Sequence, residues 1–170
     1  MRKISQMKKL FGLMAILCIG FESNAQFQVK DLSFSTGMWS GQLTYLDYTS
    51  GKPYSMAANL KVSLTEDQLG YIRRFEYPKE PQANRSDTVF VDNHHFDGAK
   101  IVQFTKGSSS ELSWVTEKMG EDGNDHQKAI IRLSYLMSST LFRIVKEVQF
   151  IGTATWIKRR SEERRVGKEC

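Results

Sequence analysis

The sequence predicts an all-β protein: an antiparallel up-and-down meander closed into a barrel of about eight or nine strands. Short runs rich in β-branched and aromatic residues recur between turn signals such as Ser50-Gly51 and Asp97-Gly98, as in sandwiches and barrels. The connections are too short for crossover helices, so neighbouring strands should be antiparallel. Trp39, in Gly37-Met38-Trp39, stands at the start of the first strand, where it can plug one end of a barrel.

Nine strands are expected after a single helical turn at residues 27–32. One of them, residues 141–150, could be a strand or a helix, because its charge spacing also allows a helix. Its apolar residues share one period-2 face that only Lys146 interrupts, which favours a strand. The expected strands are residues 39–48, 54–64, 70–77, 88–92, 100–105, 112–118, 129–137, 141–150 and 153–158.

Residues 1–25 have the order of a secretory signal peptide. Four basic residues precede the apolar run 10–21, and Ser23 and Ala25 supply the small residues of a cleavage site before Gln26. The apolar run is shorter than the roughly 20 residues of a membrane span. We therefore expect cleavage after Ala25, no transmembrane segment in the mature chain, and a periplasmic or extracellular location.

The C-terminal segment, residues 160–170, has no apolar periodicity. It resembles, residue for residue, the translation of a sequencing adapter. We therefore expect it to be a non-native tail, and the native domain to occupy residues 26–159. Resequencing the locus would refute this hypothesis if genomic DNA encodes residues 161–170.

Removing both ends changes the composition of the chain. The full chain has 24 basic and 19 acidic residues, a net charge of +5, whereas residues 26–159 have 16 and 15, a net charge of +1. This balance argues against electrostatic binding of nucleic acid. Both cysteines, Cys18 and Cys170, lie in the removed ends, so the domain depends on its core rather than on a disulfide.

Strand alternation places large aromatic side chains on shared faces. If these faces point inward, Trp39 plugs the base and an apolar ligand has an aromatic wall. The candidate ligand-binding residues are Trp39, Tyr45, Arg73, Phe75, Tyr77, Trp114 and Tyr135. The same faces would equally suit a packed core.

Arg73 and Arg74 are consecutive, so one of the two points inward, and the sequence leaves open which. A buried guanidinium needs a carboxylate or an anionic ligand. Asp47 is the candidate structural partner of Arg73, and a fatty-acid-like head group is the candidate ligand.

The Gly37-x-Trp39-x-Gly41 motif, early in an exported meander, resembles the lipocalin (calycin) superfamily and compact lipocalin-like domains of unknown function in exported bacterial proteins. The resemblance implies binding of a small hydrophobic molecule without catalysis. It also implies that Trp39 packs against a basic residue of the last strand, for which Arg159 and Lys158 are candidates.

The densest polar cluster, residues 92–98, contains His94 and His95, the candidate metal ligands. Adjacent histidines on a strand face opposite ways, and Asp97-Gly98 is explained by a hairpin turn. We therefore expect no metal. A haem-binding barrel would need an axial histidine, but His126 lies in a loop-like segment, so we expect no cofactor.

No nucleophile motif, phosphate loop or nucleotide fingerprint is present in the sequence. We therefore expect a ligand-binding protein rather than an enzyme. The alternative is a structural or interaction domain with a filled interior, which would use a sheet edge or the loop 78–87. A small barrel enzyme ranks third. Cavity volume distinguishes a binding protein from a filled barrel.

Overall fold

The computed structural model describes residues 27–92, 94–107 and 111–166. The predicted signal peptide therefore lies outside the described residues. No helix within the described part is both long enough and apolar enough to cross a membrane.

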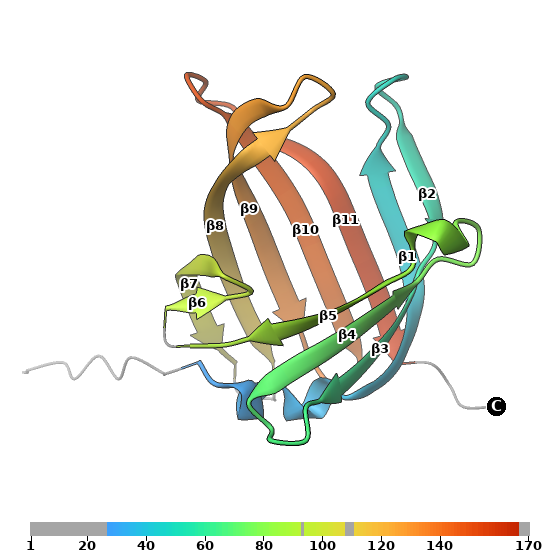
Figure 1. The fold of residues 1–170 in the computed structure, drawn as a ribbon, viewed down its shortest axis with the longest axis vertical. Helices are drawn as coiled ribbons and strands as arrows, with labels where there is room; N and C mark the ends of the chain where they lie inside the picture. The colour runs from blue at the N-terminus through green and yellow to red at the C-terminus, as the bar shows by residue number, and fades with distance from the viewer. Residues whose placement is uncertain (1–26, 93, 108–110, 167–170) are drawn as a thin grey trace, which may run out of the picture.

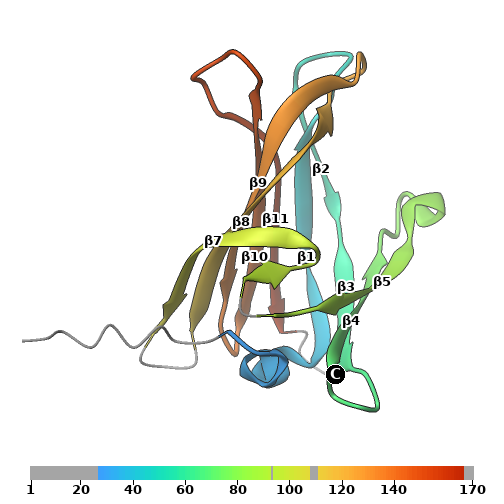
Figure 2. The same cartoon turned by 60° about the vertical axis from the view of Figure 1, so that its left-hand side comes forward.

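The described residues form a nearly closed, all-antiparallel β-barrel (Figures 1 and 2). A 3₁₀ helix, η1 (Val29–Ser35), precedes the first strand, and η2 (Pro81–Ala83) lies in the loop before β5. The strands are β1 (Gly37–Leu46), β2 (Pro53–Ala57), β3 (Asn59–Leu64), β4 (Gly70–Glu76), β5 (Arg85–Phe90), β6 (His95–Phe96), β7 (Ala99–Lys106), β8 (Leu112–Asp122), β9 (Gln127–Met137), β10 (Leu141–Phe150) and β11 (Ile157–Val166).

The strands follow one another around the barrel in chain order, which confirms the predicted meander. The spatial order runs β5-β4-β3-β1-β11-β10-β9-β8-β7-β6, and β2 also pairs with β1. At the seam between β5 and β6, a single bridge joins Val91 to Phe96. The short strand β6 then turns into β7 at Asp97-Gly98, where φ is 56° and 68°. This hairpin turn is as predicted, because Asp and Gly tolerate positive φ.

The prediction of eight or nine strands was wrong, since the described residues form eleven. The expected strand 54–64 is divided at Ala58, because β1 pairs with β2 through residues 42–46 and with β3 through residues 37–39. The backbone N–H of Ala58 donates to the carbonyl of Gly41 at the break. The two-residue strand β6 was also missed, since two residues carry no periodic signal.

The last strand lies further along the chain than expected, at residues 157–166 rather than 153–158. It closes the barrel by pairing with both β1 and β10. Residues 160–166 thus form most of β11, with charged side chains at inward positions: Glu162 and Arg164 are buried. The proposed adapter origin of residues 160–170 concerns the DNA that encodes them and stays a prediction.

The lower end of the barrel in Figure 2 is covered by η1. Trp39 fixes this helix to β1, because its indole Nε1–H donates to the carbonyl of Ser35 at 2.8 Å. The Trp39 ring packs on Phe142, with ring centroids 5.8 Å apart. Both candidates for the basic partner of Trp39 were wrong. Arg159 binds Asp122, and Lys158 is exposed and in register with Glu147, whereas Trp39 is in register with Val166.

Candidate functional site

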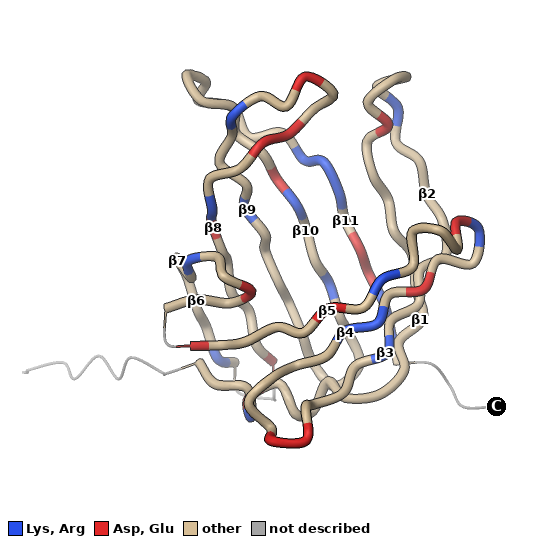
Figure 3. Tube along the Cα trace, viewed as in Figure 1, with Lys and Arg blue, Asp and Glu red and all other residues tan. Residues whose placement is uncertain are grey.

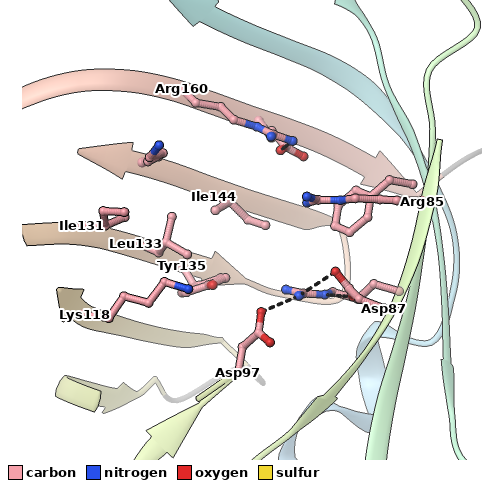
Figure 4. Close-up of a pocket in the computed structure, with 13 residues that line it drawn as sticks. Arg85, Asp87, Asp97, Lys118, Ile131, Leu133, Tyr135, Ile144 and Arg160 are labelled. Atoms are coloured by element: carbon pink, nitrogen blue, oxygen red, sulfur yellow. Dashed lines mark hydrogen bonds and ion pairs between the residues drawn. The ribbon is translucent and has the colours of Figure 1, made fainter. Parts of the chain in front are cut away.

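A cavity of about 330 Å³ lies inside the barrel and is lined by β4, β5, β8, β9, β10, β11 and the β6–β7 turn. Five of its lining residues form an apolar and aromatic wall: Phe75, Ile131, Leu133, Tyr135 and Ile144. The other eight are charged: Arg73, Arg85, Asp87, Asp97, Lys118, Lys146, Arg160 and Glu162. Figure 4 shows these side chains converging from several strands on one space.

Strand alternation explains why these side chains share the interior. On β9, Ile131, Leu133 and Tyr135 are two residues apart, so they point to the same face. On β10, Lys146 is two residues from Ile144 and interrupts the apolar face, as the sequence indicated. Figure 3 shows that charged positions recur along β10 and β11 in the barrel wall. The interior is therefore amphipathic rather than purely apolar.

Arg73 points inward and Arg74 outward, which answers the question that the sequence left open: Arg73 is 4% exposed. Its Nε donates to Asp87 at 2.7 Å, and its NH2 donates to Asp87 at 3.1 Å and to Asp97 at 2.8 Å. The dashed lines in Figure 4 mark these contacts. The predicted partner, Asp47, was wrong, because Asp47 binds Thr49 and Ser50 in its own turn.

Arg73 therefore joins three parts of the barrel seam. Asp87 faces it across the β4–β5 ladder, in direct register, and Asp97 reaches it from the β6–β7 turn. Burial alone would lower the pKa of the Arg73 guanidinium. The hydrogen bond to Asp87 and the two carboxylate charges outweigh burial, so the pKa lies above its ordinary value. The guanidinium remains charged and holds the seam together.

Tyr135 lies on the cavity wall beside Arg73 and is buried. Burial raises the pKa of the Tyr135 hydroxyl to about 12, although the nearby Arg73 charge opposes this shift. The phenol is therefore neutral at physiological pH. Its ring stacks on Trp114 at 4.6 Å, within an aromatic cluster that includes Phe27 and Phe96.

The structure distributes the seven predicted ligand-binding residues over three places. Arg73, Phe75 and Tyr135 line the main cavity. Tyr45 and Tyr77 line a neighbouring cavity of about 290 Å³. The remaining two, Trp39 and Trp114, are buried in core packing and line neither of these cavities.

Several cavity residues were missed by sequence reasoning. Lys118 was detectable, because it continues the inward face of Leu112, Trp114 and Thr116 along its strand. Lys146 was detectable as the one break in an apolar face. Asp87 was not, because its contact with Arg73 depends on the strand register, which the sequence alone does not specify.

A charged cluster next to the cavity-lining Lys146 is centred on Asp122, whose side chain is 3% exposed. Its oxygens accept hydrogen bonds from Lys146 at 2.6 Å, from Arg159 at 2.9 Å and from the Tyr48 hydroxyl at 3.0 Å. Burial alone would raise the pKa of this carboxyl, but the hydrogen bond and charge of Lys146, with Tyr48 and Arg159, lower it below its ordinary value. The cluster ties β8 to β10 and β11.

The histidine cluster has a local structural role. The Asp92 carboxylate accepts the backbone N–H groups of His94 and His95, and it lies 3.2 Å from the His95 ring. Both histidines are exposed. Among the residues placed in the structure, no group of three or more His, Cys, Asp or Glu side chains is arranged to hold a metal ion.

The fold and cavity place this chain among the small antiparallel β-barrels. The crystal structure of Rv2717c from M. tuberculosis is similar, with a TM-score of 0.56 and 8% sequence identity over 82% of this chain and 97% of that one. A protein of unknown function from the DUF3598 family of Nostoc punctiforme has a TM-score of 0.47 and 11% identity, over 84% of this chain and half of that one. The sequence matches no model of a known family and no curated protein. The likeness to Rv2717c supports the barrel fold alone.

Proposed function

We propose that the protein is an exported, lipocalin-like barrel that binds a small hydrophobic or amphipathic ligand in its interior without catalysis. The observation that carries this proposal is the cavity of about 330 Å³ with a wall of Phe75, Ile131, Leu133 and Ile144. Small-molecule sites are typically concave and largely apolar, with volumes upward of about 300 Å³. A few polar groups then orient the ligand.

The rival function, a structural or interaction domain, was expected to have a filled interior. The open volume beside Leu133 and Ile144 counts against it. The binding function therefore has the stronger physical support.

Native mass spectrometry of the protein purified from its own source tests the proposal. We expect a co-purifying small molecule at about one per chain. Leu133→Trp would enlarge a wall side chain and fill the cavity, so it should abolish the bound mass. Leu136→Trp is the matched control, because Leu136 lies on the same strand but does not line the cavity. Absence of a bound molecule, together with no binding of added octanol, would contradict the proposal.

The export part of the proposal has its own measurement. Residues 1–25 have the order of a signal peptide, so the mature protein should begin at Gln26. N-terminal sequencing of the protein isolated from the periplasm or medium checks this. A mature protein that retains Met1 would contradict cleavage without affecting the binding proposal.

A further inference from the structure

The charges that line the main cavity do not cancel. Five lining residues are basic and three are acidic. All three carboxylates already have partners, because Asp87 and Asp97 bind Arg73, and Glu162 pairs with Arg160. A third cation, Lys146, binds Asp122. Within the segment 160–170, the lining residues are Arg160 and Glu162, whose charges cancel, so the excess positive charge of the lining does not depend on that segment.

Two lining cations, Arg85 and Lys118, have no such partner. Neither forms an ion pair with a carboxylate in the part of the chain that the structure describes. Arg85 lies over the Phe75 ring, with its guanidinium carbon 4.5 Å from the ring centroid. Both residues are exposed, so water can reach their charged ends. In Figure 4 they extend into the cavity from opposite walls, Lys118 from β8 and Arg85 from β5.

Arg73 was the predicted contact for an acidic head group, but its environment argues against that role. Its Nε and NH2 groups are already directed at Asp87 and Asp97. A ligand carboxylate next to Arg73 would meet two carboxylates of the same sign. At Lys118 and Arg85, by contrast, an anion gains attraction without displacing an existing ion pair.

The apolar wall residues line the same cavity as these two cations. Ile131, Leu133 and Ile144 can receive a short alkyl or ring system while the charged end stays at Lys118 and Arg85. At about 30 Å³ per group, the volume that one water molecule occupies in the liquid, the cavity holds about ten non-hydrogen atoms. This size fits a medium-chain carboxylate.

We propose that the ligand is a small amphipathic anion, held by Lys118 and Arg85 through its charged group and by the Ile131–Leu133–Ile144 wall through its apolar part. This inference rests on the proposed binding function and deepens it. It reassigns head-group recognition from Arg73, which is a structural residue of the seam.

The test uses three probes with the same alkyl chain and different head groups. Octanoate, octanol and octylammonium are titrated into the purified full-length protein by isothermal titration calorimetry. Octanoate should bind more tightly than octanol, and octylammonium should bind most weakly. The double variant K118Q/R85Q should weaken octanoate binding by about tenfold, as expected for the loss of two partly exposed ion pairs. Its affinity for octanol should be unchanged.

The matched control is the double variant K61Q/R74Q. Lys61 on β3 and Arg74 on β4 are exposed cross-strand neighbours, and neither lines the main cavity. This variant removes the same net charge from the chain. It should therefore reproduce any long-range electrostatic effect but leave local head-group binding intact.

The outcomes separate the two proposals. If octanol and octanoate bind equally and K118Q/R85Q changes neither, the anionic ligand is refuted while interior binding stands. Equal weakening by K118Q/R85Q and K61Q/R74Q also refutes it, because the effect is then one of net charge. If none of the three probes binds and no molecule co-purifies with the protein, the binding function itself fails.

Discussion

Replacing Arg73 by Gln should destabilise the barrel at its seam. The substitution removes the charge that holds Asp87 and Asp97 together, while Gln keeps a polar side chain of moderate length. The Arg73 side chain is 5% exposed, and its two partners are 32% and 45% exposed. The variant therefore leaves two carboxylates without a cation, but water can partly solvate both.

The magnitude follows from this burial. Breaking a fully buried ion pair by removing one partner costs about 3–5 kcal/mol. The exposure of both carboxylates reduces this figure, since exposed pairs contribute about 1 kcal/mol or less. We therefore expect a loss of about 2–3 kcal/mol in the free energy of unfolding. In urea, this loss corresponds to a midpoint lowered by roughly 1–2 M for a domain of this size.

Urea unfolding followed by tryptophan fluorescence measures the effect, because Trp39 and Trp114 are buried. The control is Arg74→Gln at the next residue, which is exposed and points out of the barrel. The control should change the unfolding free energy by no more than about 0.5 kcal/mol. Equal unfolding midpoints for Arg73→Gln and Arg74→Gln would refute the assignment of Arg73 as a seam residue.

Three further predictions concern other ionisable groups. Asp122→Asn should cost about 2 kcal/mol in the free energy of unfolding, because it removes the carboxylate that binds two cations. Since the pKa of Asp122 is lowered in the folded protein, its contribution to stability is present above the ordinary pKa of 3.8 and is lost as pH falls further. The acid unfolding curves of the variant and the wild type should therefore converge. Burial raises the pKa of Tyr71 and Tyr135 to about 12. The free energy of unfolding should therefore be independent of these two groups below about pH 10 and fall between about pH 10 and 12. Phenolate absorbance should show that both tyrosines titrate late. Glu162 is buried between Arg160 and Arg164 and pairs with both; replacing Glu162 by Leu should cost about 3–5 kcal/mol, because both cations lose their carboxylate. Thermal unfolding measures the loss, and a variant as stable as the wild type would show that these ion pairs contribute no net stability.

Much of the barrel could be predicted because its signals are local. Alternation within residues 141–150 and 129–137 defines inward faces without knowledge of the partner strand. The Asp97-Gly98 turn is specified by two adjacent residues that tolerate positive φ. By contrast, the break at Ala58 arises because β1 changes partners along its length. That break depends on the assembled sheet, so no local sequence pattern predicted it.

The candidate site shows the same division. Alternation correctly grouped Arg73 with Phe75, and Tyr135 with Leu133, on single strands. It did not indicate that Arg73 lies opposite Asp87 or that the turn bearing Asp97 folds back onto it. The predicted partner Asp47 was plausible in charge but is held by its own turn.

The sequence by itself determined the strand class, the meander order and the alternating faces, because these depend on side-chain period and on short connections. Only the tertiary structure decided which of Arg73 and Arg74 is buried, which carboxylates neutralise it, and that Lys118 and Arg85 face one cavity from different strands. Such contacts depend on register and barrel closure, which join residues far apart in the chain. The cavity and its unpaired cations are therefore properties of the closed barrel rather than of any single strand.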